Sequence, residues 1–173
     1  MGVDAGRSWT DRPTKHDLVA AALAEHARQL GVITAELERL PDPRERLEAL
    51  VRGWVEQRTA RYGCRTGTLA AELDKCGVGG LDAEAGKVIR LLMGWVERQF
   101  GERGLSGPDG AALTLVGAYQ GMSLLANALR GAEVMAREGA RLTDWLDSLQ
   151  EPPGATCRRT PPPAPRRCPT SPR

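Results

Sequence analysis

The sequence has few of the residues from which catalytic and metal sites are built. It contains two histidines, His16 and His26, and four cysteines that form no CxxC pair. Neither histidine stands at a metal-ligand spacing from a cysteine, so we expect no zinc site and free thiols. No nucleophile has a base nearby in sequence, and no two carboxylates form a paired site. We expect no enzymatic activity, no metal and no cofactor.

An excess of charge of one sign is also missing. The 173 residues carry +2, and because the segment after Gln150 contributes +4, the rest of the chain carries −2. This balance excludes a nucleic-acid binder that acts by bulk positive charge. No signal-peptide core follows Met1, and no apolar run approaches the roughly 18 residues of a membrane span. We expect a cytoplasmic protein with no membrane partner.

No stretch alternates polar and apolar residues long enough to form a strand. Apolar residues instead recur with helical spacing in six segments, at residues 15–40, 43–62, 68–75, 82–102, 109–130 and 132–149. Thr14 and Asp17 have the spacing of a capping box, and Pro43 suits a first helical turn. The sequence therefore predicts an all-α bundle of about six helices.

The segment Asp109–Arg130 contains no ionisable side chain between its ends except Tyr119. A helix without charge has no broad solvated face, so we expect it to be covered on most sides. Gly117 and Gly121 share a stripe with Leu124 and Ala128, and each glycine costs a helix about 1 kcal/mol relative to alanine. The stripe therefore faces either the core of its own chain or a second copy.

Aromatic residues are scarce, at 4% of the sequence. Trp54, Trp95 and Phe100 lie on the apolar faces of separate amphipathic helices, where they either fill a core or line a cavity. Periodicity does not separate these alternatives.

The last segment, residues 151–173, has eight prolines and five arginines. Such a composition cannot bury enough apolar area to offset its ordering entropy, so we expect a disordered or polyproline-like tail. A proline-rich ligand for a partner domain or a phosphate contact is the alternative.

Three segments and the final helix carry a family resemblance. Residues 2–18 resemble the end of the DNA-binding domain of TetR/AcrR-type regulators, where a G-V-[ST]-x-G recognition helix precedes an aromatic residue and a K-x-x-L helix start. Residues 62–73 look like that family's G-C-P-x-G-x-L-A-x-E segment, and residues 118–121 resemble its x-x-Q-G. The final helix, ending in Asp144-Trp145-Leu146, also fits, so the likeness covers residues 2–150.

The resemblance implies an all-helical domain, residues 15–150, that senses a small-molecule effector and forms a homodimer. The implied dimer contact consists of Gly117, Gln120, Gly121, Leu124, Ala128, Leu142, Trp145 and Leu146. The opposite sides of the same helix, at Leu113 and Leu125, are then expected to pack internally. The implied effector pocket is lined by Trp54, Leu69, Leu91, Leu92 and Trp95.

Operator DNA is the family's further partner. The residues matching its DNA-binding end are Arg7, Trp9, Thr10, Thr14 and Lys15. Thr14 and Lys15, near a helix N-terminus, suit a phosphate. The family's first two DNA-binding helices would precede Gly2, so residues 1–14 are a remnant of the helix-turn-helix, and we expect specific DNA binding to be lost or very weak.

These observations favour a TetR-like transcriptional repressor represented by its effector-binding and dimerisation domain. The alternative is a dimerisation-only module that pairs with full-length relatives and inactivates them. A small helical-bundle enzyme is a third hypothesis, for which the sequence offers no catalytic constellation.

Overall fold

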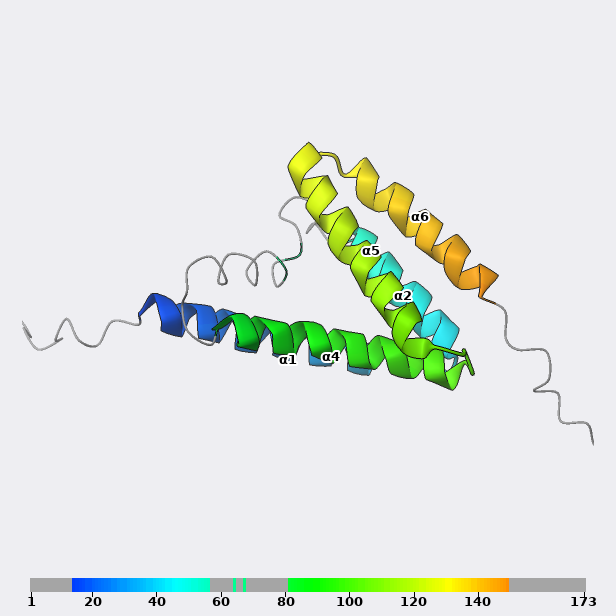
Figure 1. Cartoon of the computed structure of the whole chain (residues 1–173), viewed down its shortest axis with the longest axis horizontal. Coiled ribbons are helices and arrows are strands. Elements are labelled where there is room, and N and C mark those ends of the chain that lie inside the picture. The colour runs from blue at the N-terminus through cyan, green and yellow to red at the C-terminus, as the bar shows by residue number, and fades with distance from the viewer. Residues whose placement is uncertain (1–13, 57–63, 65–66, 68–80, 150–173) are drawn as a thin grey trace, which may run out of the picture.

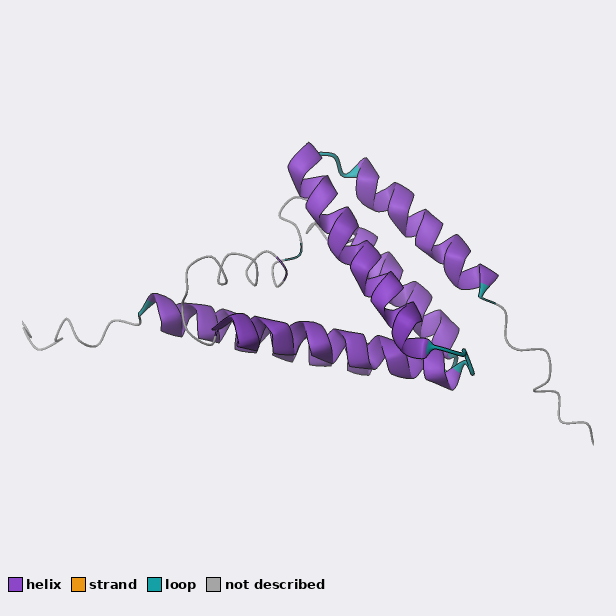
Figure 2. Cartoon of the chain, in the orientation of Figure 1, coloured by secondary structure: helices purple, strands orange, loops and turns teal. Residues whose placement is uncertain are grey.

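The computed structural model describes residues 14–56, 64, 67 and 81–149, which form five helices and no strand. The helices are α1 (Lys15–Leu37), α2 (Pro43–Glu56), α4 (Leu81–Glu102), α5 (Pro108–Leu129) and α6 (Glu133–Ser148) (Figures 1 and 2). The all-α class is confirmed. The short helix expected at 68–75, most of the recognition remnant and the tail at 151–173 lie outside the described residues.

The first helix begins where the capping box was predicted. The backbone N–H of Asp17 donates to Thr14 Oγ1 at 3.2 Å, and the backbone N–H of Thr14 donates to Asp17 Oδ2 at 2.9 Å. These reciprocal bonds satisfy two donors that a helix start leaves unpaired. Pro43 is the first residue of α2, as its fixed φ and missing N–H favour.

Left-handed residues end α4 and α5. Gly104 has φ 74°, and the next N–H, of Leu105, donates to Phe100 O at 3.1 Å. Arg130 has φ 52° and plays the same part after α5, where the N–H of Gly131 donates to Ala126 O at 3.1 Å. These turns send α5 away from the end of α4 and bring α6 back beside α5 (Figure 1).

The buried residues form a large core and a small one. The large core joins α2, α4, α5 and α6 and includes Leu47, Leu50, Val51, Trp54, Leu92, Trp95, Val96, Phe100, Leu115, Val116, Tyr119, Met122, Met135, Leu142 and Leu146. The small one consists of Leu23, Ala85 and Val88, between α1 and α4. Beyond the bundle, α1 and α4 run side by side as a two-helix arm (Figure 1).

A glycine lets α6 approach α2 closely. A Cβ atom added at Gly139 would overlap a methyl group of Val55. At the end of α6, Asp147 pairs with Arg44, whose Nε also donates to Glu48 Oε1 at 2.6 Å. Close backbone packing and this ion pair hold α6 over α2.

A partly buried polar network ties the α1–α2 connection to α4. Nη1 of Arg46 donates to Gln99 Oε1 at 3.0 Å and to Glu102 Oε2 at 2.9 Å, while its Nε donates to Leu40 O at 2.7 Å. Gln99 is almost fully buried, so this partner offsets the free-energy penalty of removing its amide from water.

Among the described helices, α5 alone is long and apolar enough to cross a membrane, judged by length and composition. The expectation that no segment approaches this limit is therefore corrected for Pro108–Leu129, where the glycines, Thr114 and Ser123 interrupt the apolar run but leave its mean hydropathy high enough for a span. The core helix of a soluble protein meets the same description. Helix α5 contacts α4 and α6, and less than half of its most apolar stretch is buried.

Candidate functional site

One face of α5 is buried and the other is open. The buried face consists of Ala111, Ala112, Leu115, Val116, Tyr119, Met122, Ser123 and Ala126. On the open face, Leu113 is 65% exposed, Leu124 66% and Leu129 67%. The expectation of a helix covered on most sides is wrong, because α2, α4 and α6 all contact α5 from one side. Leu113 and Leu125, expected to pack internally, are exposed for the same reason.

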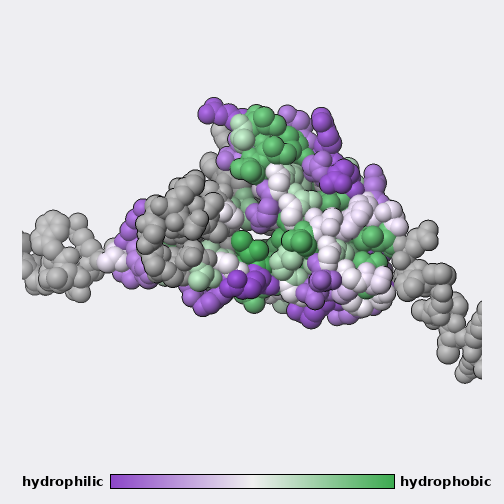
Figure 3. Space-filling model, viewed as in Figure 1, coloured by the Kyte–Doolittle hydropathy of each residue, from purple (hydrophilic) through white to green (hydrophobic). Residues whose placement is uncertain are grey.

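Small residues follow the open face at heptad spacing. Uncharged residues recur along it every three or four positions, and all of them except Leu124 are small: Gly110, Thr114, Gly117, Gly121, Leu124 and Ala128. A Cβ atom added at any of the three glycines would meet no atom within 4 Å outside its own helix backbone. These glycines therefore serve no close packing within the described part of the chain. Figure 3 shows apolar surface gathered where α5 ends at the top of the molecule.

The residues predicted for the dimer contact are divided by the structure. Gly117, Leu124 and Ala128 are exposed, and Gly121 is half-buried. Leu142 and Leu146 are fully buried in the chain's own core. A side chain with no exposed surface cannot contact a second chain, so placing these two at a subunit contact is corrected.

The remaining two dimer residues are partly engaged inside the chain. The Trp145 ring packs edge-on against Phe100, with ring centroids 5.9 Å apart. Nε2 of Gln120 donates to Cys64 Sγ at 3.3 Å. Both side chains are half-buried, so only the exposed part of each could contact a second chain.

Three of the predicted pocket residues lie in the large core. Trp54, Leu92 and Trp95 are buried there, and the indole N–H of Trp95 donates to Glu38 Oε1 at 3.0 Å. Leu91 is 56% exposed, because consecutive residues of a helix point in different directions and its neighbour Leu92 faces the core. Its assignment to an interior pocket is therefore corrected. Leu69 lies outside the described residues.

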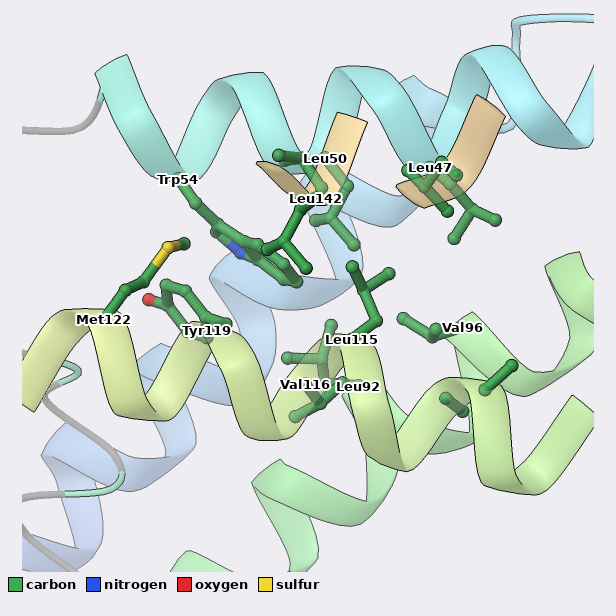
Figure 4. Packing of buried hydrophobic residues seen from close by; sticks show 14 of the residues in the cluster. Leu47, Leu50, Trp54, Leu92, Val96, Leu115, Val116, Tyr119, Met122 and Leu142 are labelled. Atoms are coloured by element: carbon green, nitrogen blue, oxygen red, sulfur yellow. The ribbon is translucent and has the colours of Figure 1, made fainter. Parts of the chain in front are cut away.

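An aromatic pair joins α2 to α5. Figure 4 shows Trp54 reaching from α2 onto the ring of Tyr119, and the two rings stack with centroids 4.2 Å apart and planes 17° apart. Burial raises the pKa of the Tyr119 hydroxyl, and its contact with Cys64 raises it further. Sequence reasoning missed Tyr119 as a site residue, although it is the only ionisable side chain inside an otherwise uncharged helix.

The polar edge of this pair is formed by residues 64 and 67. The backbone N–H of Gly67 donates to Cys64 Sγ at 3.5 Å, and a Cβ atom at Gly67 would overlap Gln120 Oε1. A thiol, an amide and a phenol thus meet beside two stacked rings. The two rings are themselves buried, so the arrangement combines an apolar interior with polar groups at its edge, as the lining of a small-molecule site does.

The N-terminus of α1 is occupied by its own acid. Hydrogen bonds from Thr14 hold the pKa of the Asp17 carboxyl below its usual value, so the carboxylate is charged where a phosphate was expected to bind. Thr14 is engaged by this cap, and Lys15 is exposed beside it. A fixed negative charge disfavours a phosphate there. Arg7, Trp9 and Thr10 lie outside the described residues.

A scan against models of known protein families and a search of curated proteins find no match for this chain.

Proposed function

We propose that residues 15–150 form the ligand-sensing and dimerising domain of a TetR-like transcriptional regulator that acts as a homodimer in the cytoplasm. The resemblance of residues 2–150 supports the family assignment. The observation that carries the proposal is the open, uncharged face of α5, with Leu113, Leu124 and Leu129 in water. Large apolar side chains exposed along one uncharged helix face are typical of a protein-interaction surface.

A second copy is the partner that best fits this face. Burying a leucine fully contributes about 1.5–3 kcal/mol, and a two-fold contact buries each exposed leucine twice. This gain is of the order needed against the ~4–15 kcal/mol that association costs. The stripe from Gly110 to Ala128 contains no charge that would have to be desolvated, and its glycines let a second helix backbone come close.

The proposed effector is an apolar, planar small molecule that binds beside the Trp54–Tyr119 pair. Stacked rings favour an aromatic ligand, while Cys64 and Gln120 supply polar groups that orient it. Because the pair joins α2 to α5, a ligand that changes the ring spacing moves α5 relative to α2. Since α5 also carries the proposed dimer face, ligand binding and subunit geometry are coupled.

The test of the dimer is a charge placed on the open face. We expect the wild-type chain to be a dimer by light scattering at about 10 μM and Leu124→Asp to be a monomer, because the dimer would bury an unpaired carboxylate. Leu18→Asp is the matched control, since Leu18 is 59% exposed on α1, away from the face. A wild-type monomer, or equal dissociation of both variants, would contradict the proposal.

A dimerisation-only module is the second candidate function. The observation that favours it is that Trp54, Leu92 and Trp95 fill the core. Thermal-shift measurements with a panel of apolar aromatic compounds discriminate the two candidates. A compound that stabilises the wild type but not Tyr119→Ala supports the ligand sensor, whereas no response together with mixed dimers formed with a full-length relative supports the module.

A further inference from the structure

The two rings of the Trp54–Tyr119 pair are closed off from water. Trp54 is 5% exposed and Tyr119 is 8% exposed. Within the large core the pair lies among other buried side chains, Leu50, Leu115, Met122 and Leu142 (Figure 4). A small molecule reaches the rings from this side only by displacing close-packed core residues. The effector proposed above therefore needs another way in.

The polar edge of the pair is covered differently. Cys64 and Gln120 are both half-buried, so part of each side chain stays in water. The Tyr119 hydroxyl contacts Cys64, whose sulfur accepts hydrogen bonds from Gln120 Nε2 at 3.3 Å and from the Gly67 N–H at 3.5 Å. A cysteine sulfur is a weak acceptor. Among the described residues, this edge is therefore the side on which the rings are covered by weak hydrogen bonds instead of core packing.

The Gln120 side chain holds both parts of this cover. Its Nε2 is bonded to the Cys64 sulfur, and its Oε1 lies so close to Gly67 that a Cβ atom added there would overlap it. The long side chain of a glutamine can leave such a position by changing its rotamer. That change breaks the bond to Cys64 without moving the backbone of α5.

We propose that Gln120 is the gate to the Trp54–Tyr119 pair, and that a small aromatic molecule reaches the rings between Gln120 and Cys64 when the amide turns away from the sulfur. The inference rests on the effector site proposed above and adds the route into it. It gives Gln120 a role in how fast a ligand enters and leaves, besides orienting the bound ligand.

The test measures access to Trp54 with acrylamide, a small neutral quencher of tryptophan fluorescence. Gln120→Ala removes one hydrogen bond of the cover, so we expect it to raise the quenching constant of Trp54 about two- to tenfold. Gly67→Ala should act in the same direction, because its methyl group displaces the Gln120 amide. When it is added to Gln120→Ala it should have no further effect, because the group that it displaces is gone.

Two controls separate a gate from a general loosening of the fold. Gln29→Ala removes an amide that donates to Glu25 on α1, and it should leave the quenching unchanged. In a Trp54→Phe chain the emission comes from the other three tryptophans, and adding Gln120→Ala should not change their quenching. If Gln120→Ala leaves access to Trp54 unchanged, or raises quenching equally in the Trp54→Phe chain, Gln120 is not a gate.

The quenching measurement needs no effector, so it fails or succeeds separately from the ligand-sensor proposal. If Gln120→Ala opens access to Trp54 while no aromatic compound stabilises the wild type, the gate is supported and the ligand sensor is contradicted. If aromatic compounds stabilise the wild type and Gln120→Ala does not change the quenching, the ligand enters by another route and only the gate is overturned.

Discussion

Tyr119 is the residue at which the core and the candidate ligand site meet. Its ring stacks on Trp54 and is 8% exposed, while its hydroxyl contacts Cys64 and Ser123. A phenol in such surroundings resists losing its proton, because the phenolate would be charged with little water around it. This property is measurable without knowing the ligand.

The stability of the protein should fall above pH 10 because of Tyr119. Its pKa in the folded chain is raised from the ordinary value of 10.0, so the unfolded chain loses the proton first as the pH rises. The contribution is fully present below pH 10 and is lost by up to about 1.4 kcal/mol per pH unit above it. Urea unfolding at about pH 8 and pH 11 should show a smaller loss for Tyr119→Phe than for the wild type. Equal losses would mean that the hydroxyl is accessible to water.

At the scale of elements, Gly139 decides how closely α6 approaches α2. Elsewhere in the helices, at Gly53 for example, a Cβ atom would meet nothing within 4 Å. Replacing these two glycines, which have the same intrinsic helix propensity, is therefore expected to change the stability of the chain in opposite directions. Only the packing around each glycine accounts for the difference.

Gly139→Ala should destabilise the chain by about 1–2 kcal/mol, because its methyl group overlaps the β-branched Val55, whose rotamer in a helix is nearly fixed. Gly53→Ala, the matched control, should stabilise it by up to about 1 kcal/mol. Denaturant midpoints give both values. Adding Val55→Ala to Gly139→Ala should recover much of the loss relative to Val55→Ala alone, and additive effects would contradict the close contact.

Helix starts and ends were predictable because their signals are local. Thr14 with Asp17, Pro43, and the glycines after α4 act through neighbouring backbone groups, which the sequence lists in order. What covers each helix was not predictable in the same way. Leu113 and Leu142 are both apolar residues at helical spacing, yet one is in water and the other in the core. The difference lies in α2 and α4, which are distant in sequence.

At the scale of the whole molecule, the described part of the chain has two cores of unequal size. Leu23 is the only buried residue of α1, and its cluster with Ala85 and Val88 is separate from the large core. Among the described residues, the start of α1 therefore makes few buried contacts. Sequence periodicity alone does not show that α1 is packed less extensively than the other helices.

Hydrogen exchange should show this inequality. We expect amides in residues 19–30 of α1 to exchange through local opening, with lower protection than those near Leu115 and Tyr119 in α5. Val88→Ala should speed exchange in α1 while leaving that part of α5 unchanged. Uniform protection across both helices would mean that the arm and the bundle open together.

The contact of α6 with α2 also has a consequence for the growing chain. Arg44 and Asp147 are 103 residues apart. At a synthesis rate of about 5–20 residues per second, α2 waits roughly 5–20 s before the end of α6 has been made. During that interval the side of Leu50 and Trp54 that α6 will cover has no native partner. The rate at which ribosomes read the intervening codons therefore sets how long the apolar face of α2 stays exposed and able to bind other proteins in the cell.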